Sequence, residues 1–278
     1  MMTPMPAPTP TITSFANPRV RAAVALRDRG ERDRSGLTLV DGARELRRAL
    51  DAGAAVVEAF VCESLLAGPD ARAALDRLRS GGPTLHPISA TVFAKLAFGQ
   101  RAEGLVAVVR IPGTELADLV LRDDPLIVIL EAVEKPGNLG AVLRSADGAR
   151  ADAVVAASPR TDLFNPNAVR ASAGTIFSVQ LGAASSEATM EWLTTRGVRI
   201  VAAKVDASRP YTESDLTGPL ALVLGAEADG LSAVWAVPTI EAIRIPMLGV
   251  ADSLNVSVSA AILLYEARRQ RGAPAARL

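Results

Sequence analysis

The chain has 278 residues, of which 49% are hydrophobic, and its 30 basic and 30 acidic side chains give a formal net charge of +0. Such a chain can bury a substantial core, which excludes an entirely disordered protein, and its length fits one large or two ordinary domains. The neutral balance excludes a general polycation, so any nucleic-acid footprint must be local. The one cysteine, Cys62, excludes an internal disulfide and fits a reducing compartment, so we expect a cytoplasmic protein.

Residues 1–15 are expected to form a flexible N-terminal tail. Met1 to Thr13 is rich in Pro, Thr and Met and has no charged region of the kind that opens a signal peptide. The sequence also has no uninterrupted apolar run long enough to span a membrane, so we expect no membrane partner.

Residues 16–111 alternate between strand and helix patterns and are interpreted as a first, small α/β domain. Pro18 suits the first position of a helix, where its missing N–H is harmless. The charged run from Arg27 to Arg34 is interpreted as a loop. Strands are predicted at 37–40, 56–61, 84–88 and 104–110, and helices at 17–27, 42–50, 71–78 and 89–96.

A linker is predicted at 112–124, between the turn at Ile111 and the polar run that ends at Pro125, and a second domain at 125–278. Its strands have unbroken apolar runs, which are typical of a parallel sheet covered on both faces. Strands are predicted at 126–130, 153–157, 177–181, 198–202, 220–224 and 242–245, and helices at 138–148, 166–171, 187–195 and from Ser253 onward. The predicted fold class is therefore α/β in both halves.

Three loops of the second half follow apolar strands, at the edge of a parallel sheet where ligands bind. The first places Asn138, Gly140 and Arg144 at N-x-G-x-x-x-R spacing; an ordinary cap with a solvated arginine is the alternative. The second, Leu224 to Leu231, has the pattern G-x-E-x-x-G. This pattern indicates a loop that lines a cofactor with its backbone, but it is not the dinucleotide fingerprint, and a plain turn is the alternative.

The third loop begins at Ile245 and leads into the last helix, which Asp252 or Ser253 could cap. Its apolar residues would suit a purine ring. At helical spacing Asn255 and Ser259 share one face, and Ser253 and Ser257 share a neighbouring one. Close packing of small residues is the alternative to a ligand site.

The sequence offers no standard catalytic set that competes with these loops. The sole histidine, His86, lies in the first half and is interpreted as structural. We find no Cys–His pair, metal-ligand cluster or Walker loop, and therefore expect no metal. Glu131, Glu134 and Glu227 remain open between acid–base chemistry, cofactor binding and pairing with arginines.

Taken in order, the three segments resemble the SpoU/TrmH family of the SPOUT methyltransferases. The residues that carry the resemblance are 138–144, 225–230 and 245–257, with 165–174 similar to an intermediate segment of the family. The first half resembles the family's substrate-binding domain, which is similar to ribosomal protein L30e. That weaker resemblance depends on Arg27–Arg34 and Leu39–Leu46, and Asp41 stands where the family more often has Glu.

The resemblance implies transfer of a methyl group from S-adenosylmethionine to a ribose 2′-hydroxyl in RNA, by a homodimer whose C-terminal domain contains a trefoil knot. It implies that the cofactor is held by Leu224, Gly225, Glu227, Ile245, Met247, Leu254 and Asn255. The family's catalytic-centre positions correspond to Asn138, Arg144, Glu227, Ser253 and Asn255. Family proposals make the arginine a base. Because an arginine stays protonated, we favour a role for Arg144 in phosphate binding and alkoxide stabilisation.

RNA binding is expected mainly from the first domain, because Ala16 to Leu50 contains nine arginines against five acidic residues. The predicted phosphate-contacting patch consists of Arg19, Arg21, Arg27, Arg29, Arg32 and Arg34; a solvated amphipathic helix and loop is the alternative.

By analogy with the family, the separate small domain favours 23S rRNA over tRNA as the substrate. The alternatives are a tRNA 2′-O-ribose methyltransferase and a non-catalytic RNA-binding ribosome-assembly protein. Because some family members protect a producer from its own antibiotic, resistance is a further hypothesis.

Overall fold

The computed structural model describes residues 10–98, 102–226 and 229–272. The chain divides into two compact units, the first made of Met1–Pro112 with Phe164–Arg170, the second of Gly113–Leu163 with Ala171–Leu278. The return of residues 164–170 to the first unit is not among the sequence expectations. Within that unit the Thr38 hydroxyl donates a hydrogen bond to the Phe164 carbonyl at 2.8 Å, a contact between residues 126 positions apart that local patterns cannot reveal.

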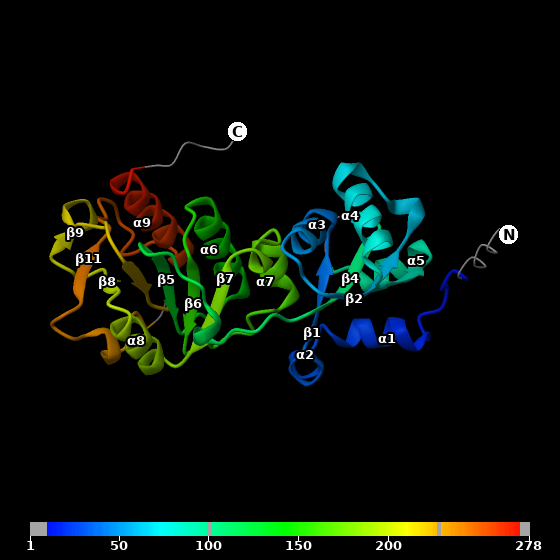
Figure 1. Ribbon diagram of the computed structural model, residues 1–278, viewed down its shortest axis with the longest axis horizontal. Coiled ribbons are helices and arrows are strands. Elements are labelled where there is room, and N and C mark those ends of the chain that lie inside the picture. The colour runs from blue at the N-terminus through cyan, green and yellow to red at the C-terminus, as the bar shows by residue number, and fades with distance from the viewer. Residues whose placement is uncertain (1–9, 99–101, 227–228, 273–278) are drawn as a thin grey trace. The chain divides into compact units, whose positions relative to one another are not determined.

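The first unit contains a mixed four-stranded sheet in the order β1-β4-β2-β3 (Figure 1). β4 is antiparallel to β1 and β2, whereas β2 and β3 are parallel. The strands are β1 (Leu37–Asp41), β2 (Val56–Val61), β3 (Thr84–Pro87) and β4 (Leu105–Arg110). The helices are α1 (Pro18–Ala25), α2 (Arg29–Ser35), α3 (Ala43–Asp51), α4 (Gly68–Gly81) and α5 (Ala90–Leu96).

The charged run that was interpreted as a loop is a helix, α2, so this interpretation is wrong. Asp28 caps it, because its carboxylate accepts a hydrogen bond from the Gly30 amide at 2.9 Å. An ion pair between Arg29 and Asp33, four residues apart, lies along the helix, and Gly36 ends it in the left-handed conformation. Local capping and charge pairing therefore outweigh the lack of an apolar stripe.

Part of the expected flexible tail is ordered. Ile12 forms a parallel bridge with Ile88: its N–H donates to the Pro87 carbonyl at 2.8 Å and its carbonyl accepts from Ser89 at 3.0 Å. Its side chain packs on the core cluster that includes Phe60 and Phe93. Burial of one apolar side chain thus fixes a segment whose composition favoured disorder.

The second unit contains a seven-stranded sheet in the order β7-β6-β5-β10-β8-β11-β9, with all neighbouring strands parallel (Figure 1). The expectation of a parallel sheet in this half is confirmed. Its strands are β5 (Leu126–Glu131), β6 (Ala153–Ala157), β7 (Gln180–Ala184), β8 (Arg199–Ala203), β9 (Arg209–Pro210), β10 (Leu220–Leu224) and β11 (Glu241–Arg244).

Helices cover both faces of this sheet, as the unbroken apolar strands predict. α6 and α9 pack against each other, and α9 also packs on β10, whereas α8 packs on β6 and β8. Alternate strand residues such as Ile127 and Ile129 meet Trp192 and Leu193 of α8. The helices of this unit are α6 (Pro136–Gly148), α8 (Ser186–Thr195) and α9 (Val256–Gln270), whereas α7 (Pro166–Ala171) lies almost entirely in the first unit. Short 3₁₀ turns occupy Glu63–Leu65, Leu116–Asp118, Thr175–Phe177, Tyr211–Glu213 and Ala233–Trp235.

Among the described residues, no helix combines the length and the apolar character that crossing a bilayer requires.

Two elements in this unit begin three residues later than the sequence predicts. The strand predicted at 177–181 begins at Gln180, because Thr175–Phe177 forms a 3₁₀ turn. The last helix begins at Val256, with Asn255 as its cap in place of Asp252 or Ser253. The Asn255 side-chain oxygen accepts hydrogen bonds from the Ser257 amide at 2.9 Å and the Ser257 hydroxyl at 2.6 Å, and this double acceptance fixes the start of the helix.

Candidate active site

The point at which the strand order reverses lies between β5 and β10. The chain runs outward from β5 through β6 to β7, and β10 then returns to pair with β5 on its other side. In a parallel sheet this arrangement leaves a crevice at the carboxyl ends of the two strands, where ligands bind. Leu130 and Glu131 end β5 on one side of the crevice, and Leu224 and Gly225 end β10 and begin its loop on the other.

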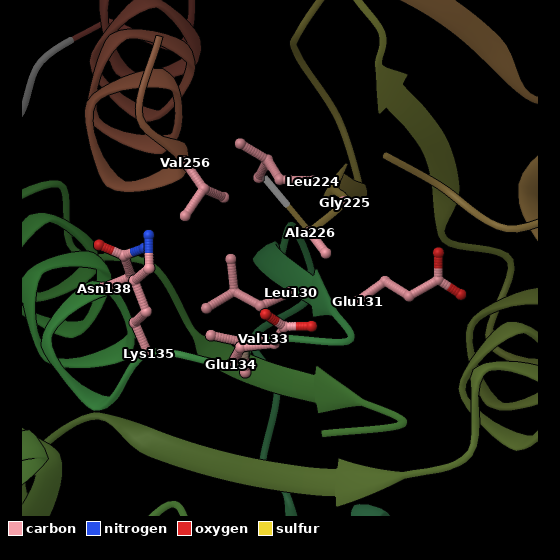
Figure 2. A pocket seen from close by; sticks show the side chains of 10 residues that line it. All are labelled: Leu130, Glu131, Val133, Glu134, Lys135, Asn138, Leu224, Gly225, Ala226 and Val256. Carbon is pink, nitrogen blue, oxygen red and sulfur yellow. The ribbon is translucent and has the colours of Figure 1, made fainter. Parts of the chain in front are cut away.

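A pocket occupies this crevice, and Figure 2 shows the side chains that line it. Asn138 and Lys135 come from the start of α6, and Val256 comes from the start of α9. The pocket is lined by Leu130, Glu131, Val133, Glu134, Lys135, Asn138, Leu224, Gly225, Ala226 and Val256.

A larger hollow adjoins this pocket and shares Leu224, Gly225, Ala226 and Val256 with it. Its other walls come from the end of β8, from Asp229 to Leu231, and from the segment before α9. A third hollow along the same segment is lined by Ile245, Met247, Ser253 and Leu254, among others. The three loops that the sequence singled out therefore meet at one edge of the sheet.

Asn138 and Asn255 connect the first and third loops directly. The Asn255 amide nitrogen donates a hydrogen bond to the Asn138 side-chain oxygen at 3.2 Å. Because the Asn255 oxygen also caps α9, one side chain both starts this helix and ties it to the start of α6. The two asparagines are 117 positions apart, yet the structure places them together as the resemblance implied.

Arg144 lies further along α6 and is exposed. It lines none of the three hollows, and within the described parts of the chain it makes no hydrogen bond or ion pair. Of the two polar side chains in the N-x-G-x-x-x-R pattern, only Asn138 lines the pocket. The exposed Arg144 guanidinium can bind a phosphate without first breaking an internal contact.

Ser253 lies in the segment before α9 and lines the second and third hollows. The prediction that it shares a helical face with Ser257 is wrong, because α9 begins only at Val256. Asn255 and Ser259 do form a helical turn, in which the Ser259 amide donates to the Asn255 carbonyl at 3.0 Å.

Gly225 and Gly230 shape the second loop. A Cβ atom added at Gly225 would lie 2.2 Å from the carbonyl carbon of Gly230, so only glycine fits there. The Gly230 amide donates to the Ala226 carbonyl at 3.0 Å, and Gly230 has φ +66°. The loop is therefore a tight turn that exposes backbone groups. Glu227, which the sequence analysis assigned to both the cofactor and the catalytic centre, lies outside the described residues.

Glu131 is a buried carboxylate that holds the edge together. It accepts hydrogen bonds from the Ser186 hydroxyl at 2.6 Å and from the Ser232 hydroxyl and amide, each at 2.7 Å. Burial by itself would raise the pKa of the Glu131 carboxyl, but the hydrogen bonds from Ser186 and Ser232 outweigh it and lower the pKa below its usual value. The geometry therefore favours a structural role for Glu131, which is not among the roles that the sequence left open.

Glu134 pairs with an arginine that the sequence analysis did not single out. One Arg160 nitrogen, Nη1, lies 2.8 Å from a carboxylate oxygen of Glu134 and 2.8 Å from one of Asp229. A sequence signal did exist, because Arg160 follows β6 at the same edge of the sheet.

In the first unit, most arginines of the predicted RNA patch have partners within the protein. Arg19 pairs with Glu58 at 3.3 Å, and Arg34 pairs with Glu31. Arg27 Nη2 donates to the carbonyls of residues 95, 96 and 97 at 2.8–3.0 Å and so caps α5. Arg21 is exposed, and no partner for it is found within the described part of the chain.

Arg32 does not belong to an exposed patch, and its assignment to the RNA surface is wrong. Its side chain is 1% exposed and Nη1 donates to the Leu26 carbonyl at 2.6 Å, just beyond the end of α1.

The interpretation of His86 as structural agrees with its contacts. It is buried, its Nε2 lies 2.8 Å from a carboxylate oxygen of Glu58, and its ring packs on Phe60.

Comparison with known proteins agrees with this architecture. Residues 17–107 match the model of an MRM3-like substrate binding domain, and residues 125–265 match that of the SpoU rRNA Methylase family. A 23S rRNA (uridine(2479)-2′-O)-methyltransferase from Streptomyces viridochromogenes is 32% identical over 255 residues, which cover 88% of this chain and 87% of that protein.

Two solved structures are similar over nearly the whole chain. A crystal structure of an RNA 2′-O ribose methyltransferase is 41% identical, with a TM-score of 0.82 over 94% of this chain and 98% of that one. An AdoMet-bound rRNA methyltransferase from Sinorhizobium meliloti is 28% identical, with a TM-score of 0.84 over the same fractions. The α/β fold with its parallel sheet is the fold of these structures, and the chain belongs to the SpoU rRNA Methylase family.

Proposed function

We propose that this protein transfers the methyl group of S-adenosylmethionine to a ribose 2′-hydroxyl in ribosomal RNA, with 23S rRNA as the substrate. The observation that carries the proposal is the meeting of the loops after β5, β10 and β11 at the switch point of the sheet, joined by the Asn255–Asn138 hydrogen bond. The Streptomyces relative and the AdoMet-bound Sinorhizobium structure support this reaction for a chain of this architecture.

The residues around the larger hollow fit the methyl donor. Leu254 and Val256 offer apolar surface for the adenine, with Ile245 and Met247 beside them along the third loop. Leu224 and Gly225 would present backbone groups to the donor, and Gly225 must be glycine because a Cβ atom there would collide with the Gly230 backbone. Glu227 completes the donor-binding set in this proposal, together with Asn255. The donor supplies an electrophilic methyl group on its sulfonium, so no metal is required.

The chain's own task is to orient the ribose hydroxyl and to stabilise its developing negative charge. We assign the second role to Arg144, which is permanently charged and has free donors. Its guanidinium would hold the adjacent phosphate in a bidentate contact, and a phosphate oxygen or a water molecule would take the proton. Asn138, Ser253 and Asn255 would fix the nucleotide by hydrogen bonds, with Glu227 as a further group of the reaction centre.

RNA would be captured mainly by the first unit. The match of residues 17–107 to a substrate binding domain supports this assignment, and the mixed four-stranded sheet is consistent with an L30e-like fold. The candidate phosphate contacts are Arg19, Arg21, Arg27, Arg29 and Arg34, without the buried Arg32. Of these, Arg21 carries the strongest expectation, because its charge is uncommitted within the described part of the chain.

Two further properties belong to the proposal by family resemblance, a homodimer and a trefoil knot in the second unit, and a cytoplasmic location belongs to it because the single cysteine fits a reducing compartment. The exposed Tyr265 and Val258 of α9 would suit a helix that contacts a second copy. Light scattering coupled to gel filtration tests the dimer: a mass near twice 28.9 kDa supports it, and a monomer at micromolar concentration contradicts it.

The deciding experiment incubates the protein and labelled S-adenosylmethionine with unmodified 23S rRNA and with tRNA, then maps ribose methylation by mass spectrometry. Methyl transfer to 23S rRNA is expected. Transfer to tRNA alone would replace the substrate, and donor-independent RNA binding without any transfer would favour the ribosome-assembly alternative. Antibiotic susceptibility with and without the gene tests the resistance hypothesis separately.

A further inference from the structure

Arg160 occupies a position at the active edge that the proposed reaction does not use. Its Nη1 lies 2.8 Å from carboxylate oxygens of both Glu134 and Asp229, and its own amide donates to the Val133 carbonyl at 3.0 Å. Glu134 belongs to the loop after β5, and Asp229 belongs to the turn after β10. One residue that follows β6 therefore connects the two loops that flank the switch point.

The turn from Gly225 to Leu231 has a second attachment of a different kind. At its far end, Ser232 donates both its amide and its hydroxyl to the buried Glu131. The Arg160 contact, in contrast, is exposed: the side chain of Arg160 is 52% exposed and that of Asp229 is 63% exposed. The buried attachment fixes the position of Ser232, and the exposed one restrains Asp229.

We propose that Arg160 is a positioning residue for the methyl donor, which holds Asp229, in the loop after β10, against Glu134, in the loop after β5. This inference rests on the proposed function, because the turn forms a wall of the hollow assigned to the donor. Exposed ion pairs are individually weak and are screened by salt, so Arg160 biases the turn toward one position without locking it. The affinity for the donor therefore depends on Arg160 and on ionic strength, whereas methyl transfer at saturating donor does not.

The first test measures the turn itself in the protein without ligands. Hydrogen exchange of the Gly230 amide, which donates to the Ala226 carbonyl, is expected to be several-fold faster in Arg160→Ala than in the unmodified protein. Arg209→Ala is the matched control, because Arg209 is 54% exposed and forms a 2.8 Å ion pair with Glu241 in the same unit. Unchanged exchange at Gly230, or an equal increase in both variants, overturns the restraint.

The second test measures binding of S-adenosylmethionine by calorimetry, together with steady-state KM and kcat. Arg160→Ala is expected to raise the dissociation constant and the KM for the donor about threefold to fivefold with little change in kcat, and Arg160→Lys is expected to recover part of the loss. Raising the salt concentration should weaken binding to the unmodified protein more than to Arg160→Ala.

The outcomes separate this inference from the proposed function. If the unmodified protein binds no donor, the proposed function fails, and the exchange measurement still decides whether Arg160 restrains the turn. If the exchange at Gly230 rises in Arg160→Ala but the donor affinity is unchanged, the role in donor binding is overturned. An equal loss of affinity in Arg160→Ala and Arg209→Ala, with equal loss of thermal stability, also overturns it.

Discussion

The sequence predicts functional charges in two regions, the carboxyl edge of the parallel sheet and the arginine-rich segment from Arg19 to Arg34. The fold uses the charges of these two regions differently. At the sheet edge a buried carboxylate, Glu131, holds the Ser186 and Ser232 loops, while Arg144, further along α6, is exposed and has no partner within the described residues. In the arginine-rich segment, Arg27 and Arg32 donate to main-chain carbonyls and stabilise helix ends. The difference shows that a cluster of charges indicates function only where the protein has not already satisfied its donors.

The largest expected effect on activity is at Arg144, the exposed arginine of α6. Arg144→Ala is expected to lower the rate of methyl transfer about 100-fold, or roughly 2.7 kcal/mol, because the developing charge and the neighbouring phosphate lose a bidentate donor. Thermal stability should stay unchanged, since Arg144 has no partner within the described residues. Single-turnover rates with labelled donor measure the effect, and full activity in the variant would remove Arg144 from the reaction.

Arg32 should behave in the opposite way. Arg32→Ala is expected to lower the free energy of unfolding by about 2 kcal/mol, because the Leu26 carbonyl loses its donor and a buried volume is left unfilled. The RNA affinity of the folded variant should equal that of the unmodified protein. Urea unfolding and filter binding provide the two measurements, and a large loss of RNA affinity with intact stability would return Arg32 to the RNA surface.

The ionisation of Glu131 should make the free energy of unfolding depend on pH. The pKa of its carboxyl is lower in the folded protein than its usual value of 4.5, so the ionised form stabilises the fold at neutral pH. This contribution is lost as the pH falls below 4.5 toward the folded-state pKa.

Glu131→Gln removes the ionised acceptor while keeping the shape of the side chain. It is expected to lower the free energy of unfolding by about 1.5 kcal/mol at neutral pH and by less in acid, because hydrogen bonds to a charged acceptor are the stronger ones. Denaturant unfolding across the acidic range measures the difference. An equal destabilisation at every pH would show that the charge of Glu131 is not what holds the Ser186 and Ser232 loops.

Asn255 allows the two roles of one side chain to be separated. Asn255→Ala removes the cap of α9 and should cost about 1 kcal/mol of stability. Asn255→Asp keeps a capping oxygen but loses the amide that donates to Asn138, so its stability should be close to normal while its activity falls. Thermal unfolding and methyl transfer are measured side by side. Normal activity in Asn255→Asp would show that the Asn138 contact is not required.

Arg21 gives the smallest expected effect and tests what remains of the arginine-rich patch. Arg21→Ala should weaken RNA binding about threefold. It should also make the negative slope of log affinity against log salt less steep, by less than about 1, as expected for one phosphate contact. Stability should change by less than about 0.5 kcal/mol, because Arg21 is an exposed surface residue. An unchanged salt slope would leave Arg21 as an ordinary solvated residue of α1.

Sequence patterns alone predicted the α/β class, the parallel sheet of the second half and the three loops that gather at one edge of that sheet. These features are local: unbroken apolar runs mark buried strands, and polar residues directly after them mark the edge where loops gather. The glycine pattern around Gly225 was likewise informative, because close approach to Gly230 leaves no room for a Cβ atom.

Only the tertiary structure decided which charged side chains are free and which are bound. The burial of Arg32, the network around Glu131 and the joint contact of Arg160 with Glu134 and Asp229 depend on partners from different elements of the fold. Asn255, and not Asp252 or Ser253, caps the last helix because its side chain can reach the Ser257 amide while contacting Asn138. Such contacts form between residues up to 117 positions apart, and the free energy that selects them depends on burial and geometry that periodicity does not encode.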